Sequence, residues 1–385
     1  MKRLLALLLS ALMLACALSV TARAEGDLPF TDIPEDYYAR DAIEYMYDTG
    51  LMNGTSDTTF SPDLPYTRAM FVTMLGRLEG VDTLKYPGSQ FRDVAVGNWA
   101  TPYINWAAQN GIVNGVGEGM FKPGNIITQE QYCTIVCRYM DTKGLDFPGK
   151  EVWKPELTDA YDLSVWAIPS VMNMVCYNLV DLDPDFAFGP KRQMDRVTIA
   201  RYFTDLHRML NEGVCPQDTF DPAAQKLNLT GTDIIAITRQ AAAYLGNWFY
   251  FNSYCDSSQT VTTGYGPYEK VINPFYASKQ DIVDQGYRFF LFDVSQQMQE
   301  VKNILAQGYD LYLSKPEGLG GFMIDRAHID ANMEDAGYVL TISYYAGREL
   351  MSTQETRLFY DSDRWVFTDL IYVDLATIDI DVAWG

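Results

Sequence analysis

Histidine and positive charge are both scarce in this 385-residue sequence. There are two histidines, His207 and His328, and they lie far apart in the chain. Sites that gather several histidines, such as many metal centres, or that need one beside a nucleophile, are therefore not expected from composition. Lys and Arg number 29 against 50 Asp and Glu, which gives a net charge of −21. Nucleic acids and anionic membrane surfaces are recognised through basic patches, so neither is predicted as a partner.

Long hydrophobic runs are also absent beyond the N-terminus. The one such run, from Leu4 to Val20, follows Lys2 and Arg3 and precedes Thr21-Ala22-Arg23-Ala24. A basic start, a short apolar segment and an A-x-A site predict a secretory signal peptide over residues 1–24. Lipoprotein processing at Cys16 is the weaker alternative. No later segment approaches the roughly 18 apolar residues of a membrane helix, so no membrane span is predicted.

Cysteine pairs with the spacing of a disulfide framework are missing too. Five cysteines follow residue 24, an odd number. Cys133 and Cys137 lie on one face of a helix predicted over Gln129–Met140. They are either two metal ligands or two small core residues, and the core interpretation is favoured because no nearby His or Cys completes a tetrahedral set. No metal and no cofactor is predicted.

Internal repeats dominate the first half of the sequence. Corresponding residues of the first two copies lie 61 positions apart, as in Phe30 and Phe91 or Thr67 and Thr128. A weaker third copy follows after a further 66 or 67 positions, with Leu157-Thr158-Asp159 at its start. Three copies at nearly constant spacing predict three similar units that pack around a shared helical core.

Each unit is predicted to contain two helices. An aromatic residue or Leu opens the unit, and the Asp two positions later is expected to cap the first helix. That helix ends at Gly50, Gly111 or Asn178, residue types that tolerate a left-handed backbone. A turn with Phe-x-Pro or Phe-Gly-Pro follows, and then a capped second helix. The three caps are Thr67, Thr128 (which forms a capping box with Gln131) and Asp195.

These motifs closely resemble the S-layer homology (SLH) domain, and the resemblance covers residues of about 28–212. It implies an all-α module of three repeats with pseudo-threefold symmetry. It also implies non-covalent binding to a secondary cell-wall polymer, which often carries acidic pyruvyl-ketal sugars. In the family a Thr-Arg-Ala-Glu-like motif supplies an Arg that faces this ligand, and a helix N-terminus with an adjacent Arg suits an anion.

The motif transfers to two of the three units. Thr67-Arg68-Ala69-Met70 keeps the Arg, Asp195-Arg196-Val197-Thr198 keeps it with different neighbours, and Thr128-Gln129-Glu130-Gln131 has lost it. We therefore expect at most two competent grooves, built around Thr67 with Arg68 and Asp195 with Arg196. The alternative for each Arg is a structural ion pair.

Aromatic residues occupy matching places in the three units. They are Tyr38, Trp99 and Trp166. As ligand-binding residues they would stack on sugar faces, and as structural residues they would anchor the core.

The repeat pattern stops at a predicted linker, and a different order of elements follows in the second half. We expect helices over Thr232–Tyr250, from Ser278, and over Val294–Gln307. Strands are expected over Tyr309–Leu313, Phe322–Asp330, Tyr338–Tyr345, Glu355–Tyr360 and Trp365–Val373, with hairpin turns at 346–348 and 361–364. This order predicts an α+β domain with helices packed on a curved antiparallel sheet.

Catalytic motifs are not found in this half, so it is predicted to be non-enzymatic, with no catalytic residue assigned. A Cys255–His328 nucleophile and base for a wall peptidase is the third choice. The aromatic residues around Trp248, Phe249, Tyr250 and the loop 265–268 either line a sugar or peptide groove or pack in the core, the latter being favoured.

The order of elements resembles cystatin-like folds and, more specifically, secreted inhibitors of D,L-endopeptidase autolysins. The residues that carry this resemblance lie in 247–250, 278–307 and 358–373. It implies that the domain binds or inhibits a cell-wall hydrolase, with a sugar- or peptide-binding module as the alternative.

The sequence thus predicts a secreted protein of the cell wall or S-layer with a multidomain organisation. The predicted segments are a signal peptide 1–24, repeats 28–82, 89–145 and 155–212, a linker 213–230 and an α+β domain 231–385.

Overall fold

The computed structural model describes most of the chain. The residues described are 28–147, 154–212, 229–250, 253–263, 266–290, 304–307, 310–313, 324–334, 337–361, 364–369, 371 and 373–384. The predicted signal peptide and residues 213–228 of the predicted linker lie outside them.

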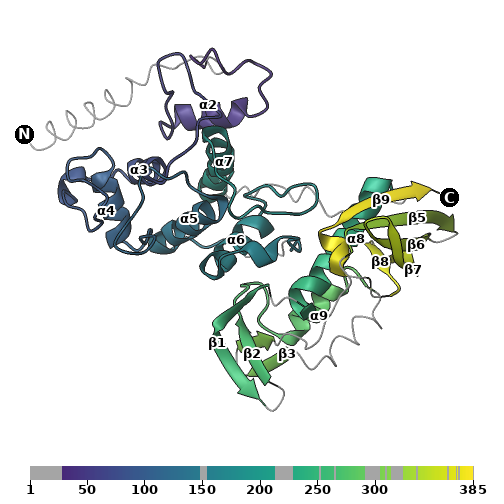
Figure 1. Cartoon of the computed structure of the whole chain (residues 1–385). Helices are drawn as coiled ribbons and strands as arrows, with labels where there is room; N and C mark the ends of the chain where they lie inside the picture. The colour runs from purple at the N-terminus through teal and green to yellow at the C-terminus, as the bar shows by residue number, and fades with distance from the viewer. Residues whose placement is uncertain are drawn as a thin grey trace, which may run out of the picture.

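The N-terminal half is helical. Its α-helices are α2 (Arg40–Asp48), α3 (Arg68–Leu78), α4 (Thr101–Gln109), α5 (Gln129–Lys143), α6 (Ile168–Cys176) and α7 (Arg196–Glu212), and short 3-10 turns cover Thr83–Lys85, Ala160–Asp162 and Val165–Ala167. The longer helices α3, α5 and α7 lie together, with α2, α4 and α6 around them (Figure 1). Their buried aromatic rings meet: the ring of Phe71 lies 5.2 Å from that of Tyr132 and 6.3 Å from that of Phe203.

The segments that precede α3, α5 and α7 form a closed ring of backbone hydrogen bonds. The N–H of Tyr66 donates to Met194 O (2.9 Å), that of Met194 to Ile127 O (3.0 Å), and that of Ile127 back to Tyr66 O (2.9 Å). All three residues are buried, so each bond satisfies groups that water cannot reach. The three segments therefore hold one another in place at the centre of this half.

The helix ends largely follow the sequence. Gly50, Gly111 and Asn178 adopt the predicted left-handed backbone, with φ of 70°, 74° and 53°. Thr67 and Asp195 cap their helices, since their side chains accept hydrogen bonds from Met70 N and Thr198 N.

The Asp near the start of each unit does not cap the first helix, and that prediction is wrong. Asp93 instead accepts from the N–H groups of Phe121 (2.8 Å) and Lys122 (2.6 Å), nearly thirty residues away. Asp32 and Asp159 bind the corresponding turns after Phe60 and Phe188 in the same way. The carboxylate suits these paired N–H groups as well as it suits a helix start, and only tertiary structure decides between them.

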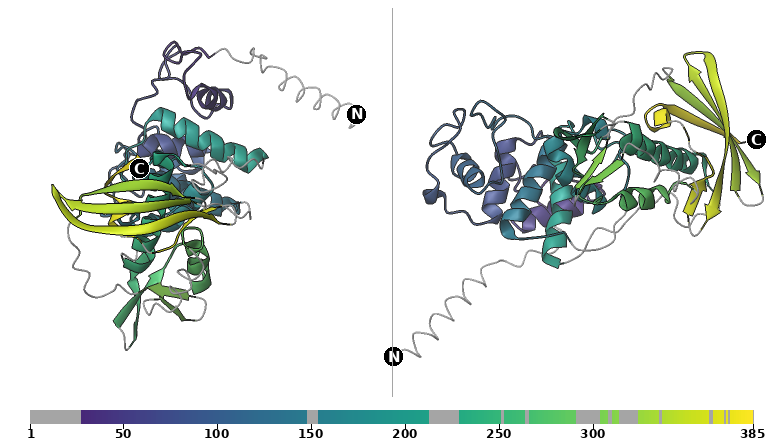
Figure 2. Two further views of the ribbon diagram at one scale, coloured as in Figure 1. Left: turned by 90° about the vertical axis from the view of Figure 1, so that its right-hand side faces the viewer. Right: turned by 90° about the horizontal axis from the view of Figure 1, so that it is seen from below.

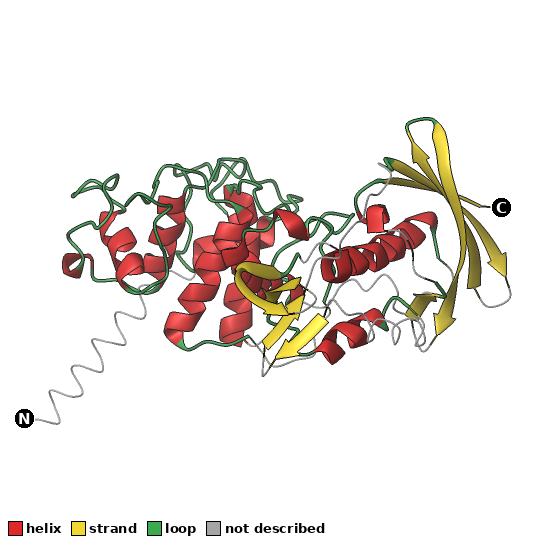
Figure 3. Cartoon of the chain, turned by 60° about the horizontal axis from the view of Figure 1, so that its bottom comes forward, coloured by secondary structure: helices red, strands yellow, loops and turns green. Residues whose placement is uncertain are grey.

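The C-terminal half combines helices with two sheets, as Figure 3 shows. Helix α8 (Gly231–Leu245) continues as a π-helical turn (Gly246–Tyr250), and α9 (Lys279–Gly286) begins with the predicted cap Ser278. One sheet has the strand order β1-β2-β4-β3, from Cys255–Thr263, Gly266–Val271, Asp310–Leu313 and Ile304–Gln307. The other has the order β8-β7-β6-β5-β9, from Arg364–Phe367, Glu349–Asp361, Gly337–Ala346, Arg326–Glu334 and Asp379–Trp384.

The five-stranded sheet packs one face on α8, and it is visibly twisted in Figure 2. Alternate residues of its central strands are buried, including Ala327, Ile329, Leu340 and Ile342. This alternation confirms the predicted amphipathic strands. The turn at Gly347 (φ 60°) is also confirmed, and Asp361 pairs with Arg364 across the antiparallel strands β7 and β8.

Three predictions for this half are wrong. The end of the helix predicted over Val294–Gln307 is strand β3, while residues 294–303 lie outside the described part. The aromatic loop around Pro267 and Tyr268 is strand β2. The large sheet is mixed, because β9 runs parallel to β5, and a second sheet accompanies it.

Candidate functional site

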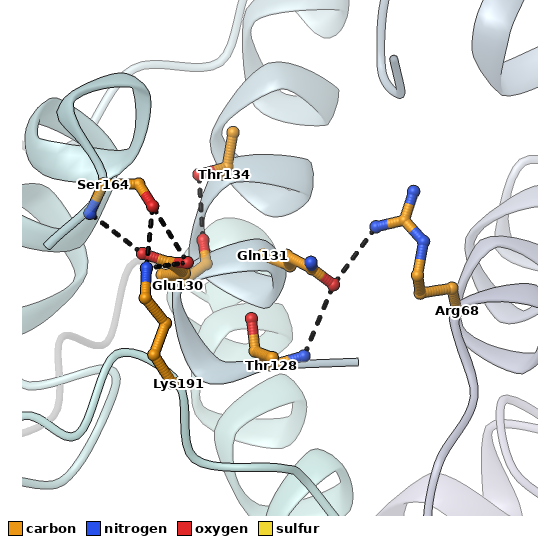
Figure 4. A network of polar contacts seen from close by, with 7 residues as sticks. All are labelled: Arg68, Thr128, Glu130, Gln131, Thr134, Ser164 and Lys191. Atoms are coloured by element: carbon orange, nitrogen blue, oxygen red, sulfur yellow. Dashed lines mark hydrogen bonds and ion pairs between the residues drawn. The ribbon is translucent and has the colours of Figure 1, made fainter. Parts of the chain in front are cut away.

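Arg68 stands at the first turn of α3 and reaches into the second repeat. Its Nη1 donates to Gln131 Oε1 at 3.2 Å (Figure 4). Its Nε donates to Phe121 O (3.0 Å), and the guanidinium lies over the Phe121 ring at 4.5 Å. The side chain is only 4% exposed. Burial lowers the pKa of Arg68 to about 10, partly offset by the charge of Asp93, so the guanidinium stays cationic at neutral pH.

The two equivalent positions make the same kind of contact. Arg196 donates through Nε to Phe60 O (2.8 Å) and through Nη2 to Asn53 O (2.6 Å), and it stacks on the Phe60 ring at 4.5 Å. Gln129, which replaces the Arg in the second repeat, donates to Phe188 O (3.0 Å). The hydrogen bonds of the two arginines thus go to backbone carbonyls and an amide, and not to the carboxylate of an ion pair.

Two adjoining cavities open beside Arg68, each of about 480 Å³. Both are lined by Arg68, Val116 and Gln131. One is completed by Val113, Asn114, Gly115, Thr134, Ile135, Arg138 and Trp166, and the other by Lys122, Gly124, Asn125, Ile126, Thr128 and Gln193. Three cations therefore line the pair of cavities, and no Asp or Glu does.

Arg138 was missed by the sequence-based assignment, although its position carries a signal. It lies ten residues after the helix cap Thr128, and Arg77 lies ten residues after the cap Thr67. The third repeat has Asp205 at the same distance from Asp195. The third repeat therefore has a carboxylate where the first two repeats have an arginine.

The surroundings of Gln129 carry charges of both signs. By the repeat spacing, Asp181 and Asp205 correspond to the cavity residues Asn114 and Arg138. Arg201 and Arg208 lie close enough to act on Asp205, and Arg201 Nη1 lies 2.7 Å from the Asp181 carboxylate in an ion pair. The two aspartates thus offset the two arginines at this position.

The predicted aromatic residues are at the surface in all three repeats. Tyr38 is 71% exposed, Trp99 56% and Trp166 49%, so the alternative that they anchor the core is wrong. Trp166 is the one that lines the cavity beside Arg68 and Arg138. Its indole face is available to a ligand there.

Gln131 lines both cavities, whereas the neighbouring Glu130 lines neither. Gln131 Oε1 accepts from Thr128 N (3.5 Å) as well as from Arg68. The neighbouring Glu130 is buried and accepts from Ser164 N (3.1 Å) and Lys191 Nζ (2.5 Å) (Figure 4). This network joins the second and third repeats and leaves Glu130 facing away from Arg68.

The cysteines of the described residues are buried thiols. Cys133 and Cys137 are core residues of α5, as favoured, and Cys137 Sγ donates to Ser170 O at 3.7 Å. Cys255 begins β1, while His328 lies on β5 of the other sheet with Asp381 2.5 Å from its Nδ1 and Asp330 3.3 Å from its Nε2. The imidazole is thus engaged by two aspartates rather than by a thiol. These carboxylates raise the pKa of His328, with the Asp381 hydrogen bond contributing most.

The helices of the described part are all too short or too polar to cross a membrane.

Comparison with known proteins supports the resemblance of the first half. Residues 29–70 and 90–133 match the S-layer homology domain. The chain is similar to a cell surface protein of Thermoanaerobacter kivui (35% identity over 34% of this chain and 18% of the relative). It is also similar to an S-layer protein of Bacillus thuringiensis subsp. finitimus (30% identity, 37% and 17%).

An endoglucanase of Bacillus sp. strain KSM-635 is 32% identical over 46% of this chain and 18% of its own length, and this match falls in the SLH region. The chain therefore covers less than a fifth of each of these relatives. The SLH matches and the surface proteins among the relatives support a location at the cell wall or S-layer.

Proposed function

We propose that residues 28–212 form one module of three SLH repeats with pseudo-threefold symmetry, which binds an acidic secondary cell-wall polymer. The closed ring through Tyr66, Ile127 and Met194 supports three equivalent units. The matching contacts of Arg68, Gln129 and Arg196 support it too. Each of these side chains donates a hydrogen bond to the backbone carbonyl of a phenylalanine in another unit.

The observation that carries the proposal is the charge of the cavities beside Arg68. A chain with a net charge of −21 places Arg68, Lys122 and Arg138 around one pair of cavities and keeps carboxylates out of their lining. Arginine binds carboxylates through paired, charge-assisted hydrogen bonds, and Trp166 can cover a sugar face. An acidic sugar such as a pyruvyl ketal matches both features.

Binding is tested by sedimentation with purified walls of an S-layer-bearing bacterium. The chain without residues 1–24 should sediment with intact walls and stay in solution with walls chemically stripped of their secondary polymer. Arg138→Ala should reduce sedimentation, whereas Arg348→Ala, at an exposed turn of the other half, should not. Equal sedimentation with both kinds of wall would contradict the proposal.

Arg68→Ala and Arg196→Ala are expected to abolish sedimentation when combined. Because both arginines also hold backbone carbonyls of other repeats, each variant needs a thermal unfolding curve beside the binding curve. Loss of binding with an unchanged unfolding temperature would assign the arginines to the ligand.

For the C-terminal domain we propose a non-enzymatic role in binding or inhibiting a cell-wall hydrolase, such as a D,L-endopeptidase autolysin. The separation of Cys255 from His328 on two sheets favours this over a peptidase. A sugar- or peptide-binding module is the second candidate. Trp248, however, is fully buried and so is not a surface platform for a sugar.

Inhibition is tested by following the turbidity of purified sacculi that are digested by a D,L-endopeptidase. Added protein should slow the decrease in turbidity in proportion to its concentration. The protein alone should leave the sacculi intact. Lysis by the protein alone would overturn the non-enzymatic role, and Cys255→Ala would then locate the activity.

A further inference from the structure

An extended segment at the start of the third repeat is inserted into the C-terminal domain. The main chain of Glu156 pairs with the Gln240 side chain on α8 through two hydrogen bonds, N to Oε1 (2.9 Å) and Nε2 to O (2.7 Å). Gln285 of α9 donates to Lys154 O (2.7 Å), and Asn247 donates to Leu157 O (3.0 Å). Residues 154–157 are thus bound as an extended peptide would be.

The side chain of Glu156 is fully enclosed in this pocket, with 1% of the residue exposed. Its carboxyl group has five donors, all from the C-terminal domain. They are Trp248 Nε1 (3.1 Å), Tyr276 OH (3.4 Å) and Gln285 Nε2 (3.5 Å) on Oε1, and Tyr254 OH (3.2 Å) and Asn247 Nδ2 (3.3 Å) on Oε2.

The backbone of the pocket is unusual at the point of contact. Asn247 and Trp248 belong to the π-helical turn that follows α8, so both side chains are turned toward Glu156 by an irregular helix end. Such π-turns are rare and occur frequently at functional sites. The rings of Trp248 and Tyr276 lie 4.4 Å apart and close the pocket beside the carboxyl group.

All five donors are neutral, and within the described residues Glu156 forms no ion pair. The titratable groups around it are Tyr244 on α8, Tyr254, Tyr276 and Cys176 on α6. Burial raises the pKa of the three tyrosines well above the usual value, so they stay uncharged. Lys154 lies over the Tyr276 ring at 5.3 Å. A buried carboxylate without a cation is costly, whereas a neutral carboxyl group is not.

We infer that the C-terminal domain contains a carboxyl-binding pocket whose ligand is residues 154–157 of its own chain, and that this contact is a latch between the two halves that closes on protonation of Glu156. The protonated carboxyl keeps an acceptor for Trp248 and can donate to the Tyr254 oxygen. The latch fixes the C-terminal domain against the wall-binding repeats, and its release would expose a pocket suited to an acidic side chain.

The direction of the pH dependence follows from burial. Burial raises the pKa of Glu156, and the five hydrogen bonds offset this only in part. A carboxyl group whose pKa is raised in the docked state favours docking when protonated. Its contribution is complete below the ordinary pKa and is lost as pH rises through the raised pKa, by up to tenfold in the docking constant per pH unit.

Hydrogen–deuterium exchange of the chain without residues 1–24 tests the latch at the peptide that contains Glu156 and Leu157, with rates corrected for the intrinsic effect of pH. In the wild type, protection of this peptide should fall up to tenfold per pH unit as pH rises from about 5. Glu156→Gln, which mimics the protonated acid, should keep high protection at every pH. Glu156→Ala should lose it at every pH.

Glu355→Gln is the matched control, because Glu355 is an exposed acid on β7, and it should follow the wild-type profile. A peptide from α5 reports global unfolding and should stay protected throughout. Should Glu156→Ala fail to fold, the wild type and Glu156→Gln still decide the question. A pH-independent wild type, or a Gln variant with the wild-type pH profile, would overturn the inference.

Discussion

The surroundings of Arg68 and those of Gln129 show how the same backbone arrangement can carry different charges. Both residues occupy the first turn of a helix and donate to the carbonyl of a phenylalanine in another repeat. Beside Arg68 the chain places Arg138 and Lys122. At the position equivalent to Arg138, the repeat spacing gives Asp205 instead.

This difference separates two roles of the first-turn residue. The hydrogen bond to the phenylalanine carbonyl holds the repeats together and needs only a donor, which Gln129 supplies. The proposed binding of an acidic ligand needs net positive charge, and around Gln129 two aspartates offset Arg201 and Arg208. We therefore expect variants to change the fold of a repeat and its proposed binding independently.

Among the variants that compare these two positions, Arg138→Ala is expected to have the largest effect. Arg138→Ala removes one charge-assisted contact and should weaken binding to purified walls by about 10- to 100-fold. Asp205→Ala, at the equivalent place in the third repeat, should leave binding unchanged or slightly tighter. Sedimentation isotherms measure both, and equal losses would refute the contrast between the two positions.

The exposed aromatic residues should show the same contrast on a smaller scale. Trp166→Ala takes away a stacking surface beside the cations, and a loss of roughly 2- to 10-fold is expected. Tyr38→Ala should have no effect on wall binding, because Arg201, which lies over the Tyr38 ring at 5.8 Å, is paired with Asp181. Both residues are exposed, so the unfolding temperature should change in neither variant.

Asp93 and Asp159 occupy equivalent positions in the second and third repeats, so their variants compare how each carboxyl group affects the free energy of unfolding. Burial alone would raise the pKa of Asp93, but hydrogen bonds from Phe121 and Lys122 lower it below its usual value. For Asp159 burial outweighs the same kind of bonds and the pKa is raised. Ionised Asp93 therefore stabilises the fold above its ordinary pKa, and this is lost as pH falls through the lowered value. Asp159 favours the folded state when protonated.

At pH 7, Asp93→Asn should lower the free energy of unfolding more than Asp159→Asn does, because only the Asp93 site favours the ionised carboxylate. The difference between the two variants should narrow only as pH falls below about 3.8, the ordinary aspartate pKa, because Asp93 keeps its charge above that value. Urea unfolding at pH 7 and at about pH 3 measures this difference. A larger loss for Asp159→Asn at neutral pH would reverse the assignment.

The smallest effect is expected from introducing arginines at and near Gln129. Gln129→Arg combined with Asp205→Arg restores both cations, but Asp181 remains and pairs with Arg201. We expect a gain in wall affinity of at most about threefold. A decrease would indicate that the new Arg does not fit over Phe188.

The sequence was sufficient for features set by local chemistry. Repeat spacing, the caps Thr67, Asp195 and Ser278, and the left-handed Gly50, Gly111 and Asn178 all depend on residues close in the chain. The hairpin turn at Gly347 is a further feature of this kind.

The sequence was insufficient where a residue interacts with another that is distant in the chain. The carboxylate of Asp93 could cap a helix or bind a turn 28 residues away, and only the assembled repeats select the turn. The pocket of Glu156 gathers residues between 84 and 129 positions away. Strands β1 and β2 were missed because β1 is rich in Ser and Thr with few buried residues, so it lacks a hydrophobic period.

The closed ring through Tyr66, Met194 and Ile127 restricts how this half could have evolved. An open array of repeats can gain or lose a copy at either end, since each copy touches only its neighbours. Here every copy donates one bond and accepts another, so a fourth would find no vacant partner and a deletion would strand a buried N–H and a buried C=O. In the proposed three-repeat module, adding or removing a single repeat would therefore break this ring.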